Sequence, residues 1–270
     1  METPPPGMFV RPLQRNTKKK SVTPTTVSCV ALDCLLCRTW LAAVSWDSMS
    51  RLRLWGHARF RAGRVLWMLE ELGLDYEHRP LWSRTADMEA PDFLAASPRR
   101  KIPVIQDGDF TLTESAAINT YLCDTYAPDS GWVPPPCTRD RAIYDAWLMT
   151  IMTELDAQSL YIHRKHQCLS EVYGAAPVVV DAARDYFLRQ LESVTAVLQA
   201  SPSLLAGAHT FTAADLLLTH CLCWAREIDW LPDDPVLRAY LDRNTARPAF
   251  QRYIAKARED PHASGPRPSA

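Results

Sequence analysis

The chain lacks any large excess of one charge. Its 270 residues carry 30 Lys and Arg side chains against 31 Asp and Glu, which gives a formal net charge of −1. Without a basic surface, no general electrostatic field attracts the protein to nucleic acid or to an anionic membrane. The composition therefore predicts neither a nucleic-acid partner nor a membrane partner.

A membrane-length apolar run and a disulfide pattern are missing as well. The nearest approach to a membrane span, residues 27–46, is interrupted by Asp33 and Arg38. Eight cysteines in 270 residues are too few and too scattered for a secreted disulfide scaffold, and free thiols suit a reducing compartment. We expect a globular protein of the cytoplasm.

No group of cysteines and histidines has a complete metal-ligand spacing. Cys29, Cys34 and Cys37 have the x4, x2 spacing of one iron–sulfur pattern, but no fourth cysteine follows nearby. His163 and His166 have no carboxylate partner at helical spacing, which is more typical of an exposed helix face than of a metal site. We predict no metal.

Residues 1–49 differ from the rest of the chain. Met1–Ser28 is rich in Pro, Ser and Thr and carries Lys18–Lys20, so we expect it to be disordered. Two origins remain open for this extension. It resembles a transit peptide loosely, or it precedes a natural start at Met49, which the immediate entry into a strand at Leu52 favours.

Residues 50–128 have the pattern of an α/β domain. Leu52–Trp55 alternates as a strand, Val65–Leu72 has helical spacing up to Gly73, and Tyr76–Arg79 is predicted as a second strand. A short helical segment over Ala90–Ala96 precedes a hairpin and a third helix. The predicted order is β-α-β-α-β-β-α, which is thioredoxin-like.

The hairpin spans residues 100–115. Asp107-Gly108 is a strong turn signal, and Pro103 forces the preceding Ile102 into an extended conformation with its N–H and C=O facing outward. Glu114 and Ser115 open the next helix, whose free N–H groups favour an anion. An extended backbone edge beside an anion-binding helix start predicts a small acidic peptide as the ligand.

The second half is predicted to be entirely helical. The Pro-rich residues 129–138 form a linker, residues 139–258 contain helical periodicity, and residues 259–270 form a flexible tail. Thr212 and Asp215 predict a capping box before a buried helix. Ile143 and Trp147 are predicted on one apolar helix face. Seven side chains are expected mainly in the core, although the first four could line a second-substrate pocket: Tyr144, Trp147, Met152, Tyr161, His220, Cys221 and Cys223.

This order of elements resembles the soluble glutathione transferases over about residues 50–258. Short stretches look like the bacterial-type members: Trp55-Gly56-His57, Arg64–Leu72 and Arg247–Phe250. The resemblance implies a glutathione-binding thioredoxin-like domain followed by an all-helical domain, usually assembled as a homodimer. It also implies detoxification of an apolar electrophile.

By the same resemblance, five residues would hold glutathione as co-substrate. Pro103 would be the family's cis-proline, and Ile102 would pair through its backbone with the cysteinyl part. Glu114 would face the γ-glutamyl ammonium, Ser115 the γ-glutamyl carboxylate, and Lys101 the glycine carboxylate.

The loop after the first strand departs from the family pattern. Catalytic members place a Ser, Tyr or Cys there, whereas Phe60 occupies that position here and no hydroxyl or thiol occurs between Ser50 and Glu70. Lowering a thiol pKa from about 8.5 to about 6.5 requires roughly 2.7 kcal/mol, and a charged hydrogen bond supplies about 1.5–3 kcal/mol. Arg59 is the candidate for thiolate stabilisation, with Arg61 as the other possibility.

Two functions remain open at this stage. The first is a glutathione transferase that conjugates the glutathione thiolate to an electrophile, or reduces a peroxide, between the two domains. The alternative is a non-catalytic transferase-like binding or scaffold protein, which the residue Phe60 favours. A thiol–disulfide oxidoreductase is disfavoured because the first loop contains no cysteine.

Overall fold

The computed structural model describes residues 52–205 and 211–259. The chain divides into two units, Met1–Ser48 and Met49–Ala270, and every described element belongs to the second unit. The expectations for residues 1–49 and 260–270 lie outside the described residues. Along the described part of the chain, no helix combines the length and apolar character needed to cross a bilayer.

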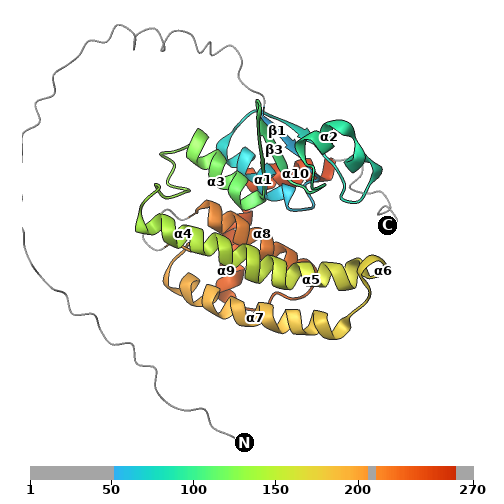
Figure 1. The fold of residues 1–270 in the computed structure, drawn as a ribbon. Coiled ribbons are helices and arrows are strands. Elements are labelled where there is room, and N and C mark those ends of the chain that lie inside the picture. Colours follow the sequence, from blue (N-terminus) through green and yellow to red (C-terminus); the bar gives the residue numbers. More distant parts are fainter. Residues whose placement is uncertain (1–51, 206–210, 260–270) are drawn as a thin grey trace, which may run out of the picture. The chain divides into compact units, whose positions relative to one another are not determined.

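A four-stranded mixed sheet forms the first half of the second unit (Figure 1). The strand order is β2-β1-β3-β4, with β1 parallel to β2 and antiparallel to β3, and with β3 antiparallel to β4. The strands are β1 (Leu52–Trp55), β2 (Tyr76–Arg79), β3 (Val104–Asp107) and β4 (Phe110–Thr113). The β3–β4 hairpin turns at Asp107-Gly108, as its sequence predicts.

The helices of this half complete the predicted β-α-β-α-β-β-α order. They are α1 (Ala62–Leu72), the 3₁₀ turn η1 (Ala86–Glu89), α2 (Pro91–Ala96) and α3 (Ser115–Tyr126). Helix α1 is buried over nearly its whole length and ends at Gly73, whose φ of 62° gives a left-handed C-cap. The thioredoxin-like fold expected from the sequence is confirmed.

Beyond the Pro-rich segment, the described regular structure is helical, as expected. A continuous rod runs from α4 to α6, with α7 alongside it (Figure 1). The segments are α4 (Arg139–Thr150), η2 (Ile151–Leu160), α5 (Tyr161–His163), η3 (Arg164–Cys168), α6 (Ser170–Tyr173), α7 (Pro177–Ala200), α8 (Ala213–Glu227), α9 (Pro235–Thr245) and α10 (Pro248–Glu259).

Two parts of the rod, η2 and η3, are π-helical, which the 3.6-residue periodicity did not predict. The wider turn of a π-helix frees main-chain acceptors and changes which side chains face the neighbouring elements. Within η2, Ser159 Oγ donates to the Glu154 carbonyl oxygen at 2.7 Å. This geometry places Asp156 on the buried side of the rod.

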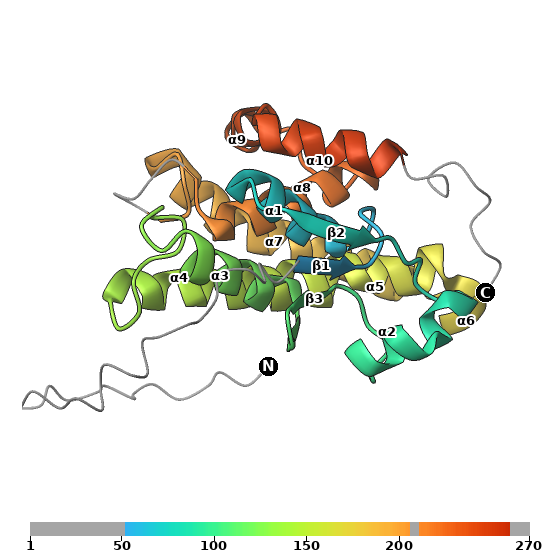
Figure 2. The same cartoon turned by 90° about the horizontal axis from the view of Figure 1, so that it is seen from above.

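The core is continuous between the sheet-containing half and the helical half. The indole of Trp67 on α1 contacts the rings of Phe211, Phe250 and Tyr253, and α10 packs on α1 (Figure 2). Tyr144 is buried as expected, whereas Ile143, predicted on an apolar helix face, is 50% exposed. Ile143 lies one residue before Tyr144, and a helix turns about 100° per residue.

Candidate functional site

The Ile102–Pro103 peptide bond is cis, and it directly precedes β3. Among the described residues, the N–H and C=O groups of Ile102 have no backbone hydrogen-bond partner. The neighbouring Lys101 is held through its backbone: its N–H donates to Ser97 Oγ at 3.0 Å, and its C=O accepts from the same hydroxyl at 2.9 Å. These two hydrogen bonds hold the backbone at Lys101, whose side chain is exposed, next to the extended backbone of Ile102.

Helix α3 begins at Ser115, directly after a residue with unusual backbone geometry. Glu114 has φ of +71°, a conformation that non-glycine residues adopt rarely and that clusters at ligand sites. Its exposed carboxylate pairs with Arg99 at 3.0 Å, whereas Ser115 is only 2% exposed. The free N–H groups and the positive dipole end of α3 favour a carboxylate at this position.

The loop between β1 and α1 carries Phe60 rather than a nucleophile-activating group. The Phe60 ring packs edge-on against Trp82 with a centroid distance of 5.4 Å, and against His57 at 6.1 Å. Arg59 is exposed, and its backbone N–H donates to His57 Nδ1 at 3.0 Å. This loop presents an aromatic surface with an exposed guanidinium beside it.

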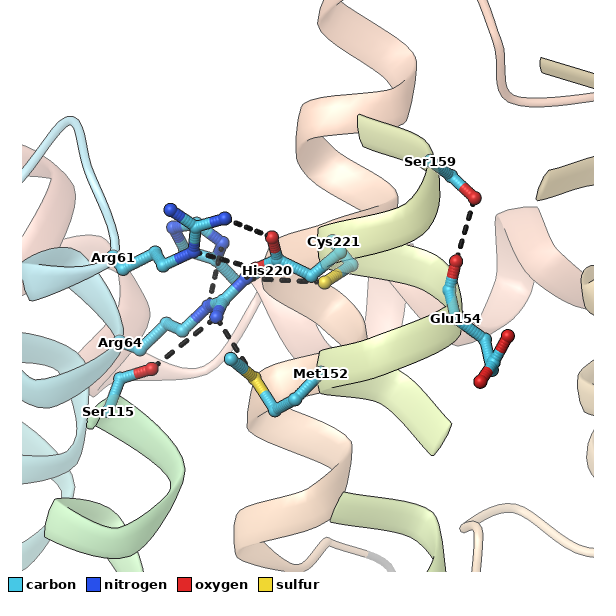
Figure 3. A network of polar contacts seen from close by, with 9 residues as sticks. Arg61, Arg64, Ser115, Met152, Glu154, Ser159, His220 and Cys221 are labelled. Carbon is cyan, nitrogen blue, oxygen red and sulfur yellow. Dashed lines mark hydrogen bonds and ion pairs between the residues drawn. The ribbon is translucent and has the colours of Figure 1, made fainter. Parts of the chain in front are cut away.

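A buried ionic network joins the start of α1 to η2 and α8 (Figure 3). Asp156 is fully buried and accepts from both guanidiniums: Arg61 Nε donates to Oδ2 at 2.9 Å, and Arg64 Nη2 donates to Oδ2 at 2.6 Å. A second Arg61 nitrogen donates to Oδ1. Arg61, the other candidate for thiolate stabilisation, is therefore paired with a buried carboxylate.

Arg64 extends this network to the helix start of α3. Its Nη1 lies 3.4 Å from Ser115 Oγ and 3.2 Å from Met152 Sδ, its Nε donates to His220 Nδ1 at 3.2 Å, and its Nη2 lies 3.3 Å from Cys221 Sγ. One completely buried guanidinium therefore links three elements around Ser115 (Figure 3). The expectation that His220 is an ordinary core residue is incomplete, because its ring accepts from Arg64.

The charges of the network set its protonation states. The guanidiniums of Arg64 and Arg61 overcome the effect of burial and hold the pKa of Asp156 at about 2. Burial, together with the positive charge of Arg64, lowers the pKa of His220 well below its usual value. Burial also raises the pKa of the Cys221 thiol to about 12. Asp156 is therefore ionised, while His220 and Cys221 are neutral near pH 7.

The spacing of the sequence does not predict that Arg64 and Asp156 belong to the candidate site. One feature of the sequence indicates them: each is a charged residue next to apolar residues of a predicted helix. Arg64 precedes Val65–Leu69, and Asp156 follows Leu155. A charge on a buried helix face needs an opposite charge. The identity of the partner could not be found from spacing, because the two residues are 92 positions apart.

Comparison with known proteins agrees with this geometry. The family model for the glutathione S-transferase N-terminal domain matches residues 61–125. Glutathione S-transferase 3 of Zea mays is 31% identical over 202 residues, which cover 71% of this chain and 87% of the maize protein. The chain belongs to the glutathione S-transferase family.

Other relatives of this transferase come mainly from plants and fungi. The glutathione S-transferase-like protein OpS6 of Beauveria bassiana is 27% identical over 225 residues, covering 79% of this chain and 93% of the fungal protein. The bacterial-type membership expected from the sequence is not supported. Short matches around α1 and α10 could not distinguish the branches, because these stretches form the buried core.

Two solved structures, one with oxidized glutathione and one with glutathione bound, share the fold. A glutathione transferase of Phanerochaete chrysosporium in complex with oxidized glutathione matches with a TM-score of 0.66 and 24% identity over 78% of this chain and 98% of that protein. A theta-class transferase of Xanthomonas axonopodis pv. citri with glutathione bound matches with a TM-score of 0.64 and 25% identity, covering 76% and 98%.

No group of three or more His, Cys, Asp and Glu side chains capable of holding a metal occurs in residues 52–205 and 211–259. The candidate site residues supply a backbone edge, a helix start and cationic side chains. These groups bind anions and peptide backbone.

Proposed function

We propose that this transferase binds reduced glutathione along Ile102 and at the start of α3, and directs its sulfur toward the loop that carries Phe60. The observation that carries the proposal is the Ile102 backbone edge, which has no backbone hydrogen bond within the described residues, together with the positive φ of Glu114 beside a buried Ser115. Each residue keeps the role that the family resemblance implies.

The assignments follow from charge and backbone geometry. The Ile102 N–H and C=O pair with the cysteinyl residue as an added strand would. The γ-glutamyl carboxylate accepts from the Ser115 N–H and hydroxyl, the γ-glutamyl ammonium meets Glu114, and Lys101 receives the glycine carboxylate. Arg99 pairs with Glu114 in the free protein, so glutathione has to compete with an exposed ion pair of low strength.

Catalysis requires a thiolate, and Arg59 is our candidate for stabilising it. Arg59 is an exposed residue next to Phe60 in the loop between β1 and α1, where the family resemblance places the thiolate-stabilising group. The reaction class is attack of the thiolate on an electrophile with an apolar body, or reduction of a peroxide. Arg59→Ala should leave glutathione affinity unchanged and shift the pH dependence of conjugation to higher pH.

The first test is a calorimetric titration with glutathione, followed by turnover with 1-chloro-2,4-dinitrobenzene. Binding with turnover supports the enzyme. Absence of binding would remove the whole site assignment. Both measurements use the full chain.

A second function, a non-catalytic binding or scaffold protein, is favoured by the packing of Phe60 against Trp82 and His57. Binding without turnover would support it. The Phe60→Ser substitution then restores a hydroxyl at the family's sulfur-contacting position, and a gain of turnover in this variant would show that Phe60 alone silences the site. Phe60→Ala is the matched control, because it opens the same space without supplying a hydroxyl.

The assembly we propose is a homodimer, as is usual in the resembling family. Exposed apolar side chains support it: Phe110 on β4 is 45% exposed and Met149 on α4 is 61% exposed. We also propose a cytoplasmic location and a detoxifying role, for which the cysteine usage of the chain and the proposed chemistry are the support. Subcellular fractionation tests the location.

A further inference from the structure

Arg164, the first residue of η3, holds a partly buried guanidinium against aromatic rings. Its Cζ lies 4.7 Å from the centre of the Phe60 ring and 6.0 Å from that of Tyr161, and its Nη2 donates to Ser83 Oγ at 3.0 Å. Within residues 52–205 and 211–259, no carboxylate forms an ion pair with it. Within the described residues, the contacts of this guanidinium are therefore with two aromatic rings and one hydroxyl.

Further cations lie over the Tyr161 ring and over the ring of Tyr173. Arg84 lies 4.9 Å from the Tyr173 ring centre, and Lys165 lies 5.1 Å from that of Tyr161. Arg61 lies 4.6 Å from the Tyr161 ring centre, but Asp156 already neutralises it. Burial and the positive charges of Arg61 and Arg84 lower the pKa of Arg164.

A desolvated guanidinium without a carboxylate is costly unless an anion completes the arrangement. Guanidinium binds carboxylate through two parallel N–H donors, and the neighbouring ring faces can contact an aromatic body. The contact with Phe60 places this anion-binding group beside the position where the family brings the glutathione sulfur.

We propose that Arg164 binds the anionic group of the second substrate, and that the preferred electrophile is an aromatic compound carrying an ionised carboxylate. This inference rests on the proposed glutathione transferase function. It specifies that the electrophile carries a negatively charged group beside its apolar body. For an aryl chloride, the glutathione thiolate forms a C–S bond at the ring carbon, the C–Cl bond breaks and chloride leaves. The thiol proton goes to solvent, and the carboxylate is unchanged.

The test compares 4-chloro-3-nitrobenzoate with 4-chloro-3-nitrobenzamide on the full chain, with each kcat/KM divided by the uncatalysed rate with glutathione. The wild type should favour the benzoate. Arg164→Gln should lower the benzoate value by about tenfold or more, as expected for a lost charged pair, and change the amide value by less than about twofold. The control is Arg189→Gln on α7, which removes an exposed guanidinium that also lies over a ring, that of Tyr186.

A binding measurement separates this proposal from the proposed function. Calorimetry with unreactive 4-nitrobenzoate and 4-nitrobenzamide needs no turnover. Binding of the benzoate that is lost in Arg164→Gln supports the anion site even if conjugation is absent. The proposal is overturned if the wild type binds the benzoate and the benzamide with equal affinity. It is also overturned if Arg164→Gln lowers the affinity for glutathione and slows conjugation of both electrophiles to the same extent, because Arg164 would then bind glutathione.

The Arg164→Lys variant keeps the experiment decisive if Arg164→Gln does not fold. Lysine retains the positive charge but loses the paired N–H donors. The benzoate preference should then be reduced without being abolished. A preference equal to that of the wild type would contradict a paired guanidinium–carboxylate contact.

Discussion

Substituting Ser115 tests the proposed contact with glutathione by removing a single hydroxyl. It is buried at the start of α3, and its hydroxyl lies 3.4 Å from Arg64 Nη1. We expect Ser115→Ala to raise the glutathione Kd by about tenfold or more, because a hydrogen bond to a charged group contributes about 1.5–3 kcal/mol. Isothermal titration calorimetry measures this change.

Ser193→Ala on the exposed face of α7 is the matched control for the Ser115 substitution, since it removes the same hydroxyl from a helix surface. Its glutathione Kd should equal that of the wild type. If Ser115→Ala also leaves the Kd unchanged while folding normally, the hydroxyl does not contact the γ-glutamyl carboxylate.

Asp156 carries the negative charge that pairs with both arginines of the buried network. Replacing it by Asn leaves the buried Arg64 guanidinium without its carboxylate, and breaking a buried pair in this way costs about 3–5 kcal/mol. We expect Asp156→Asn to lower the free energy of unfolding by about this amount at pH 7. Denaturant titration followed by circular dichroism measures it.

The pH dependence of this loss follows from the pKa of Asp156. The folded-state pKa, about 2, lies below the ordinary value of 3.8, so the ionised carboxylate stabilises the folded protein above about pH 4. This stabilisation is lost as the pH falls through about 2. The difference between wild type and Asp156→Asn should therefore narrow below pH 4, whereas the exposed-site control Asp185→Asn should differ little from wild type throughout.

At the scale of elements, the start of α8 is more than a helix cap. The Asp215 carboxylate accepts from the Thr212 N–H at 2.8 Å and hydroxyl at 2.6 Å, completing the predicted capping box. It also accepts from Ser203 Oγ at 2.8 Å, the Leu204 N–H at 3.0 Å and the Tyr240 hydroxyl at 2.8 Å. Asp215 thus connects α8 to α9 through Tyr240, and to the segment that contains Ser203 and Leu204.

We expect Asp215→Ala to lower the free energy of unfolding by at least about 3 kcal/mol, because several buried donors lose their acceptor at once. An ordinary cap is worth about 1 kcal/mol. Asp234→Ala provides that comparison, since Asp234 caps α9 through the Val236 and Leu237 N–H groups. Equal losses in the two variants, measured by denaturant titration, would show that the extra contacts of Asp215 contribute nothing.

The π-helical segment η2 shows why an element can be predicted while its site residue is not. Apolar spacing over Ile151 and Leu155 indicates a helix correctly. This π-helical segment packs against α7 and α8. In it, Asp156 faces Arg61 and Arg64. Periodicity alone cannot supply that rotation.

At the scale of the whole molecule, the proposed dimer makes a separate prediction. Phe110→Glu combined with Met149→Glu places charges on the exposed apolar positions of β4 and α4, and burying them in an interface would be costly. We expect this double variant to sediment as a monomer where the wild type sediments as a dimer. Analytical ultracentrifugation over a range of concentrations makes the measurement.

Val178→Glu is the control for the dimer prediction. Val178, at the start of α7, is 81% exposed and apolar, but it lies outside β4 and α4. This variant should remain a dimer. Dissociation caused by Val178→Glu but not by the double variant would place the interface on α7 instead.

The sequence by itself determined the order of strands and helices in the first half and the backbone edge at Ile102. Pro103 and the Asp107-Gly108 turn predicted the Ile102 edge and the hairpin, and Thr212 with Asp215 predicted the start of α8, because these effects act within a few residues. Only the tertiary structure decided the partners of buried charges. Asp156 meets Arg64 across 92 positions and Arg164 lies against Phe60, since contacts between distant segments depend on how whole helices pack and not on local spacing.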